Sequence, residues 1–121
     1  MFVLDSHCDT PSHILNHRDL SLDNELAQVD FPKLERGGVD GAFFALYIPA
    51  ELDTEAARNH MYAMLEGVKR TVRDNQNRAA FAVSRSQALQ NKSQGLFTVF
   101  LGLENGSPLG NHFRRGSILI L

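Results

Sequence analysis

The sequence lacks the features that tie a chain to nucleic acid, to a membrane or to an oxidising compartment. It has a single cysteine, so no internal disulfide can form, and that usage fits a reducing cytoplasm. The net charge of -2 is not the basic excess of a nucleic-acid-binding domain. No apolar run approaches the ~18 residues of a membrane span, and the first residues do not resemble a secretory signal. We therefore expect a cytoplasmic protein.

The sequence also lacks repeats, low-complexity tracts and linkers. Its 121 residues are 43% hydrophobic and 21% charged, which is close to the average of globular proteins. A chain of this length and composition suits one small domain with a packed core.

Short apolar runs recur along the chain, bounded by glycine, proline or polar residues. Because these runs are continuous and not alternating, they predict buried strands of a parallel sheet. The runs are Phe2–Leu4, Ala42–Ile48, Ala79–Val83, Leu96–Leu103 and, near the end, Ile118–Leu121.

Helical patterns separate the predicted strands. Asp53 or Thr54 can cap an amphipathic helix whose apolar positions are Ala57, Met61, Met64, Leu65, Val68 and Val72. Shorter helices are expected at Ser12–Leu20, Asp30–Arg36 and from Ser84 or Ser86 to Leu89; the segment 21–29 is left open. Strands that alternate with helices predict a parallel α/β fold with both sheet faces covered.

Polar residues with metal-binding chemistry follow two of the strands. His7 and Asp9 are two residues apart, so in an extended backbone both point the same way and form half of a shell for a cation such as zinc. Glu104 ends another strand, and parallel α/β proteins place their sites at these carboxyl ends. The alternative is a surface turn in which Asp9 caps the next helix and Glu104 is a solvated acid.

Other histidines and the cysteine are weaker candidates. His13 and His17 are four apart, but Ile14 stands where the metalloprotease pattern requires glutamate. Cys8 lies between two candidate ligands, and its side chain should point away from them into the core. His60 lies on the amphipathic helix at the boundary of its apolar face.

The segment Val3–Pro11, with its Asp-Ser-His-Cys-Asp core, resembles the opening of the renal (membrane) dipeptidase family, zinc peptidases of the amidohydrolase superfamily. Most of that superfamily has His-x-His at this place, so His-x-Asp is distinctive. Further similar segments follow in the family's order over residues 2 to about 110; they are Val29–Leu34, Gly37–Val39, Phe43–Tyr47 and Leu103–Gly106.

This resemblance implies a (β/α)8 barrel that holds two zinc ions and hydrolyses dipeptides. His7 and Asp9 would bind one zinc, Glu104 would bridge both, and a hydroxide held by the metals would attack the peptide carbonyl. Asp5 is part of the motif without being a ligand, and we expect it to orient the turn or His7. The family also suggests tolerance of a D-residue at the carboxyl-terminal position of the dipeptide.

A complete barrel of this type needs ~250 residues, so residues 1–121 would form its first half. The family's later histidines, arginine and aspartate are then missing, and Ser107–Gly116 stands where the family has a helix and a strand. His112 receives no role, and a deletion, a frameshift or a truncation would each explain the tail. We expect the isolated chain to be inactive and to associate through unpaired strand edges and an uncovered apolar interior.

Two rival functions remain open. One is another metal hydrolase of the same superfamily, such as a deacetylase or a deaminase, which His-x-Asp disfavours. The other is a noncatalytic remnant or assembly module. The preferred dipeptide and the oligomeric state are not determined by the sequence.

Overall fold

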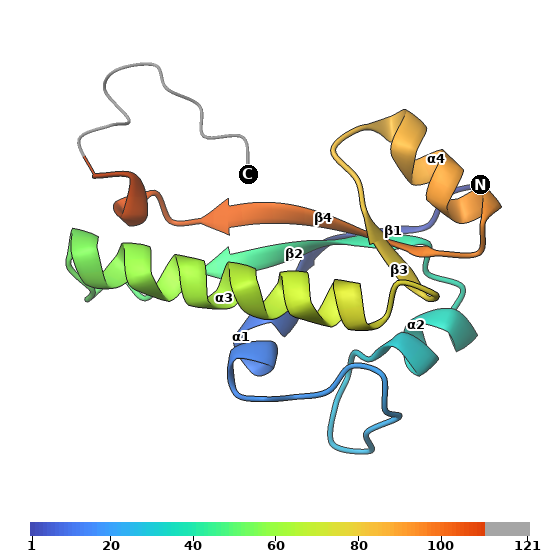
Figure 1. The fold of residues 1–121 in the computed structure, drawn as a ribbon, viewed down its shortest axis with the longest axis horizontal. Coiled ribbons are helices and arrows are strands. Elements are labelled where there is room, and N and C mark those ends of the chain that lie inside the picture. Colours follow the sequence, from blue (N-terminus) through green and yellow to red (C-terminus); the bar gives the residue numbers. More distant parts are fainter. Residues whose placement is uncertain (111–121) are drawn as a thin grey trace.

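The computed structural model describes residues 1–110, in which parallel strands alternate with helices. Figure 1 shows these elements along the chain. They are β1 (Leu4–Cys8), α1 (Thr10–Leu15), α2 (Phe31–Arg36), β2 (Gly41–Tyr47), α3 (Thr54–Asp74), β3 (Ala79–Phe81), α4 (Arg85–Ser93) and β4 (Phe97–Glu104). The predicted parallel α/β class is confirmed. The tail expected at Ser107–Gly116 and Ile118–Leu121 lies mostly outside the described residues.

The four strands form one sheet in the order β1-β2-β4-β3, and every neighbouring pair is parallel. β2 pairs with β4 along its whole length, from Gly41 opposite Thr98 to Tyr47 opposite Glu104. β3 pairs only with the first part of β4, where Phe81 lies opposite Val99. The carboxyl ends of β1, β2 and β4 therefore lie at the same edge of the sheet (Figure 1).

One face of the sheet packs against α1 and α3 to form the core (Figure 1). The amphipathic pattern of α3 is confirmed, because its predicted apolar positions are all buried. Asp53 caps the helix as expected, since its carboxylate accepts a hydrogen bond from the Ala56 N–H at 2.8 Å. Met61 and Met64 fill the core, and Phe44 and Leu46 of β2 are buried on the same face of the sheet.

The opposite face is only partly covered by the described residues, which corrects the expectation of two covered faces. Phe43 is 38% exposed and stacks on Phe100 with ring centroids 4.8 Å apart. Tyr47 lies further along β2 on the same face and is also exposed. At the other end of the strands, Asn91 of α4 hydrogen-bonds Thr98 and covers part of this face. The part of this face formed by the carboxyl-terminal halves of β2 and β4 is therefore open among the described residues, as we expected for a partial barrel.

The first strand differs from its prediction. It spans Leu4–Cys8 and not Phe2–Leu4, and only Cys8 among its residues is buried. The physical reason is its place at the edge of the sheet, where β2 is its single partner among the described strands. Its register also shifts between Asp5 and Cys8, as in a bulge.

Helix and strand lengths differ at three further places. The helix expected to reach Leu20 ends at Leu15, because His17 adopts a positive φ of 64° and turns the chain away. The helix expected to end at Leu89 continues to Ser93 with Ser84 as its cap. The strand expected to reach Val83 ends at Phe81.

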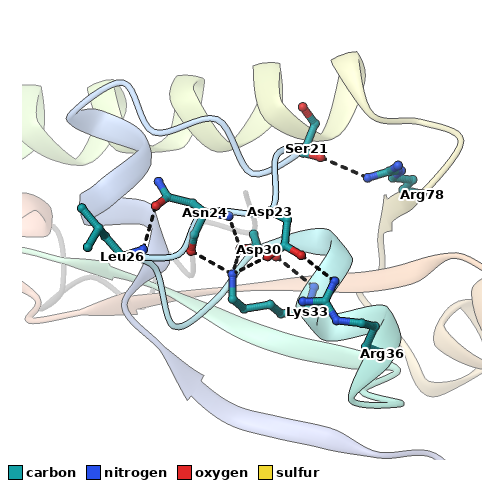
Figure 2. Close-up of polar contacts among 8 residues, drawn as sticks. All are labelled: Ser21, Asp23, Asn24, Leu26, Asp30, Lys33, Arg36 and Arg78. Atoms are coloured by element: carbon teal, nitrogen blue, oxygen red, sulfur yellow. Dashed lines mark hydrogen bonds and ion pairs between the residues drawn. The ribbon is translucent and has the colours of Figure 1, made fainter.

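Hydrogen bonds and ion pairs of a buried aspartate and three charged neighbours hold the loop between α1 and α2 against α2 (Figure 2). Asp30 caps α2 by accepting a hydrogen bond from the Lys33 N–H, and its other carboxylate oxygen accepts one from the N–H of Asn24 in the loop. It also forms an ion pair with the Lys33 ammonium. Asp23 pairs with Arg36 at 2.7 Å and with Lys33 at 2.9 Å. The hydrogen bonds from Arg36 and Lys33 lower the pKa of Asp23 from 3.8 to about 2.

Within residues 1–110, no helix combines the length and the apolar character that crossing a bilayer requires.

Candidate metal centre

The three predicted ligands come together at the carboxyl edge of the sheet. His7 lies in β1, Asp9 follows that strand directly, and Glu104 is the last residue of β4. One ligand atom from each lies within 4.8 Å of the other two, and within residues 1–110 this is the one such group of three histidine, cysteine or acidic side chains. His13, His17 and His60 do not join it.

Both carboxylates approach the same nitrogen of the His7 imidazole. Its Nε2 atom lies 3.3 Å from Asp9 Oδ1 and 3.3 Å from Glu104 Oε2. The three side chains keep 55%, 61% and 42% of their surface exposed, respectively. A cation and a small ligand could therefore reach all three without unfolding the sheet.

The Glu104 carboxylate provides a test of whether this group suits a cation. Its Oε2 atom is buried and has no hydrogen-bond donor, because the nearby His7 nitrogen is not aligned for a hydrogen bond. A buried carboxylate oxygen without a partner carries a desolvation cost. A cation held between His7 and Glu104 would remove that cost, so the donor set fits a metal ion.

The backbone around His7 explains why the side chains of His7 and Cys8 point in opposite directions. The Asp5 carboxylate accepts a hydrogen bond from the His7 N–H at 3.0 Å, so Asp5 restricts the backbone at His7, as we expected. The Cys8 side chain points to the opposite face, where it is buried and its sulfur lies 3.0 Å from the Thr10 hydroxyl. The alternation of side chains therefore places His7 at the open edge and Cys8 in the core.

Asp9 occupies the N-cap position of α1, yet its side chain makes no capping hydrogen bond. Its carboxylate lies instead next to the His7 imidazole. This arrangement disfavours the alternative in which Asp9 serves only to cap the helix, because a capping carboxylate accepts an N–H of the first turn.

Two neighbours that no sequence motif singles out, Ile48 and Asn105, hold the backbone at Glu104. The Ile48 N–H donates to the Glu104 carbonyl at 3.3 Å. Asn105, the next residue, has a positive φ of 75° and donates a side-chain hydrogen bond to the Ile48 carbonyl. The Asn-Gly pair at 105–106 was the available sequence signal, since asparagine tolerates a left-handed backbone better than most residues.

A hollow of about 520 Å³ opens beside His7 and Asp9. It lies along the outer edge of β1, and its lining includes His7, Asp9, His13, Arg18 and Gln28. This volume is within the range of small-molecule sites. A small molecule placed there would touch the edge of the sheet at which His7 and Asp9 lie.

The comparison with curated proteins finds no significant match. The family model described as membrane dipeptidase (peptidase family M19) matches residues 1–115.

Solved structures share the fold of the chain at low sequence identity. The dipeptidase AC, a metallopeptidase of family M19, has a TM-score of 0.83 and 20% identity over 93% of this chain and 37% of its own. A metallopeptidase from Rhodobacter sphaeroides, liganded with a phosphinate mimic of the dipeptide L-Ala-D-Ala, has a TM-score of 0.80 and 17% identity over 93% of this chain and 40% of its own.

The probable dipeptidase PvdM from Pseudomonas aeruginosa is also similar, with a TM-score of 0.73 and 19% identity over 95% of this chain and 32% of its own. The chain thus spans two fifths or less of the length of these structures. Since the family model covers nearly the whole sequence, the chain belongs to the membrane dipeptidase family, peptidase family M19.

Proposed function

We propose that this chain supplies the first ligands of a zinc-dependent dipeptidase, and that residues 1–121 form the amino-terminal part of its barrel domain. The observation that carries the proposal is the convergence of His7, Asp9 and Glu104 from two separate strands on one point. The chain belongs to a peptidase family, and this membership supports a role of the three side chains in peptide hydrolysis. A group of three donors also leaves a coordination position for water or substrate, as catalytic zinc sites do.

The donor set favours zinc over calcium or magnesium. The latter two prefer shells made of oxygen atoms alone, whereas one imidazole nitrogen with two carboxylates suits zinc. Glu104 also has two oxygens, so it could bridge two ions while Oε2 remains beside His7. We therefore propose that His7 and Asp9 hold one zinc and that Glu104 is shared with a second.

A bound zinc ion would polarise a peptide carbonyl and lower the pKa of a bound water. The residues of this chain hold and orient the metal: His7 and Asp9 from the end of β1, and Glu104 from the end of β4. Asp5 restricts the backbone at His7 through its hydrogen bond to the N–H. The proposed substrate is a dipeptide, in keeping with the dipeptide mimic carried by the Rhodobacter sphaeroides relative.

Under this proposal, hydrolysis of dipeptides requires residues beyond those of this chain. The chain covers 37% of the length of dipeptidase AC, and residues 1–110 present three ligand side chains. We infer that the isolated chain binds zinc without turning over dipeptides. The single buried thiol, Cys8, fits a reducing compartment, and the cytoplasm is the proposed location.

Zinc titration of the purified chain tests the metal-binding part of the proposal. We expect one strong site per chain whose affinity falls at least about tenfold in His7→Ala, because an imidazole ligand is lost. His60→Ala is the matched control, since His60 lies on α3 and does not belong to the group, and its affinity should equal that of the unchanged chain. Equal affinities in all three proteins would support a noncatalytic module instead.

Substrate class is tested on a full-length relative that contains the same ligand residues. We expect cleavage of dipeptides, including those with a carboxyl-terminal D-residue, and loss of cleavage when a chelator removes the metal. Hydrolysis of acetylated or amino-substituted substrates without dipeptide cleavage would favour a deacetylase or a deaminase.

A further inference from the structure

Asn105 has a backbone conformation that most residues avoid. Its φ is 75°, and it follows Glu104 directly. A left-handed backbone costs a non-glycine residue roughly 1–2 kcal/mol, although asparagine is among the residues that adopt it most readily. Strain of this kind persists only where surrounding contacts hold the residue in place.

Two side-chain hydrogen bonds hold Asn105. Its Nδ2 group donates to the Ile48 carbonyl at 3.0 Å, and its Oδ1 atom accepts from the Ser107 N–H at 3.0 Å. Ile48 follows β2 and is buried, so it provides a rigid partner. Because the Ile48 N–H donates to the Glu104 carbonyl, a pair of hydrogen bonds ties the end of β4 to the end of β2.

A separate contact holds the turn that follows. The Arg58 side chain of α3 donates from Nε to the Pro108 carbonyl at 3.2 Å, and the Leu109 N–H donates to the Gly106 carbonyl at 3.0 Å. The turn thus stays attached to α3 if the Asn105 side chain is removed. Removal of the Asn105 side chain would therefore loosen the backbone mainly at Glu104 and Asn105.

We propose that Asn105 is a positioning residue of the metal centre, which holds the Glu104 carboxylate toward His7 through its hydrogen bonds to Ile48 and Ser107. The inference rests on the proposed function, because it requires Glu104 to bind a metal. The physical reason is that the Glu104 Oε2 atom has no donor of its own to hold it, so its direction depends on the backbone that Asn105 fixes. Groups that orient a ligand in this way typically change metal affinity 10–100-fold when they are lost.

The alternative is that Asn105 only stabilises the fold. Two variants separate these roles. Asn105→Gly removes both side-chain hydrogen bonds but tolerates the positive φ, so the chain should still fold. Asn75→Ala is the matched control, because Asn75 at the end of α3 also donates from Nδ2 to a carbonyl, that of Thr71, at 2.9 Å.

The experiment measures zinc affinity by calorimetry, the visible spectrum of bound Co²⁺, and thermal unfolding without metal. We expect Asn105→Gly to weaken zinc binding about tenfold or more and to change the Co²⁺ spectrum. Asn75→Ala should lower the unfolding temperature while zinc affinity and the Co²⁺ spectrum stay as in the unchanged chain. Asn105→Asp keeps the acceptor for Ser107 but places a carboxylate oxygen opposite the Ile48 carbonyl, so it should weaken zinc binding as well.

Glu104→Gln distinguishes failure of this inference from failure of the proposed function. If Glu104→Gln weakens zinc binding and Asn105→Gly leaves the affinity and the Co²⁺ spectrum unchanged, Asn105 is not a positioning residue and the metal centre stands. If Glu104→Gln has no effect either, both the inference and the role of Glu104 are overturned.

Discussion

His7 Nε2 and Glu104 Oε2 lie 3.3 Å apart although β2 separates their strands in the sheet. Two strands with a third strand between them are about 10 Å apart in a flat sheet. The side chains of His7 and Glu104 therefore lean toward each other over the end of β2. The Oδ1 atom of Asp9 lies at the same distance, 3.3 Å, from the same His7 nitrogen. The site is therefore a product of the sheet order, because it exists only when β4 pairs with β2.

Asp30 is expected to contribute much more stability than an ordinary helix cap. Asp30→Ala should lower the free energy of unfolding by about 3 kcal/mol, because it removes a cap and leaves the partly buried Lys33 ammonium without its nearest carboxylate. Urea denaturation measures the loss.

Asp53→Ala is the control for Asp30→Ala, since Asp53 also accepts the N–H three residues on but lies at an exposed helix end. Its loss should cost about 1 kcal/mol. Equal losses in the two variants would show that the ion pair at Asp30 adds nothing.

The charged cluster around Asp23 predicts a loss of stability in acid. Arg36 and Lys33 lower the pKa of Asp23 from 3.8 to about 2, so the folded chain binds this proton less readily than the unfolded chain. The resulting stability is present above pH about 4 and disappears as the pH falls toward 2. Urea unfolding of the unchanged chain and of Asp23→Asn, measured from pH 6 to pH 2, should give a difference that shrinks to near zero. A difference that stays constant over this range would contradict the assignment.

Close packing between β2 and β4 leaves no room for a side chain at Gly41. A Cβ atom there would lie 2.9 Å from the Thr98 carbonyl oxygen and 3.0 Å from its Cβ, so Gly41→Ala should cost about 2 kcal/mol. Gly102→Ala in β4 is the matched control, because its Cβ meets nothing within 4 Å, and alanine should be neutral or stabilising there. Similar melting temperatures for the two variants would argue against the observed strand spacing.

The open face around Phe43 and Phe100 predicts self-association of the isolated chain. Exposed apolar surface of this kind favours contact between copies, so the mass measured by light scattering should rise with concentration. Phe43→Ser should reduce the effect. Tyr62→Ser should not, because Tyr62 is similarly exposed but lies on α3. A monomer at every concentration would refute this expectation.

Local patterns in the sequence predicted much of the fold. The Asp53 cap and the apolar spacing marked α3, and the run 42–48 marked β2, because these signals depend on neighbouring residues. The end of α1 and the extent of β1 were wrong or incomplete, since they depend on the turn at His17 and on an edge position in the sheet. The position of β3 beyond β4 had no local signal at all.

The site was predictable to different degrees. Side-chain alternation placed His7 and Asp9 together and Cys8 in the core, which needed only the strand period. The proximity of Glu104 required the rule that parallel strands end at one edge, together with the family resemblance. Asn105 was missed because its hydrogen bond joins it to Ile48, a residue distant in sequence.

The most direct measurement of the central claim is an anomalous diffraction map from crystals of the chain grown with zinc. We predict a peak about 2.0–2.2 Å from a nitrogen of His7 and from carboxylate oxygens of Asp9 and Glu104. A peak at Cys8, His13 or His60 with none at this group, or no peak at all, would contradict it.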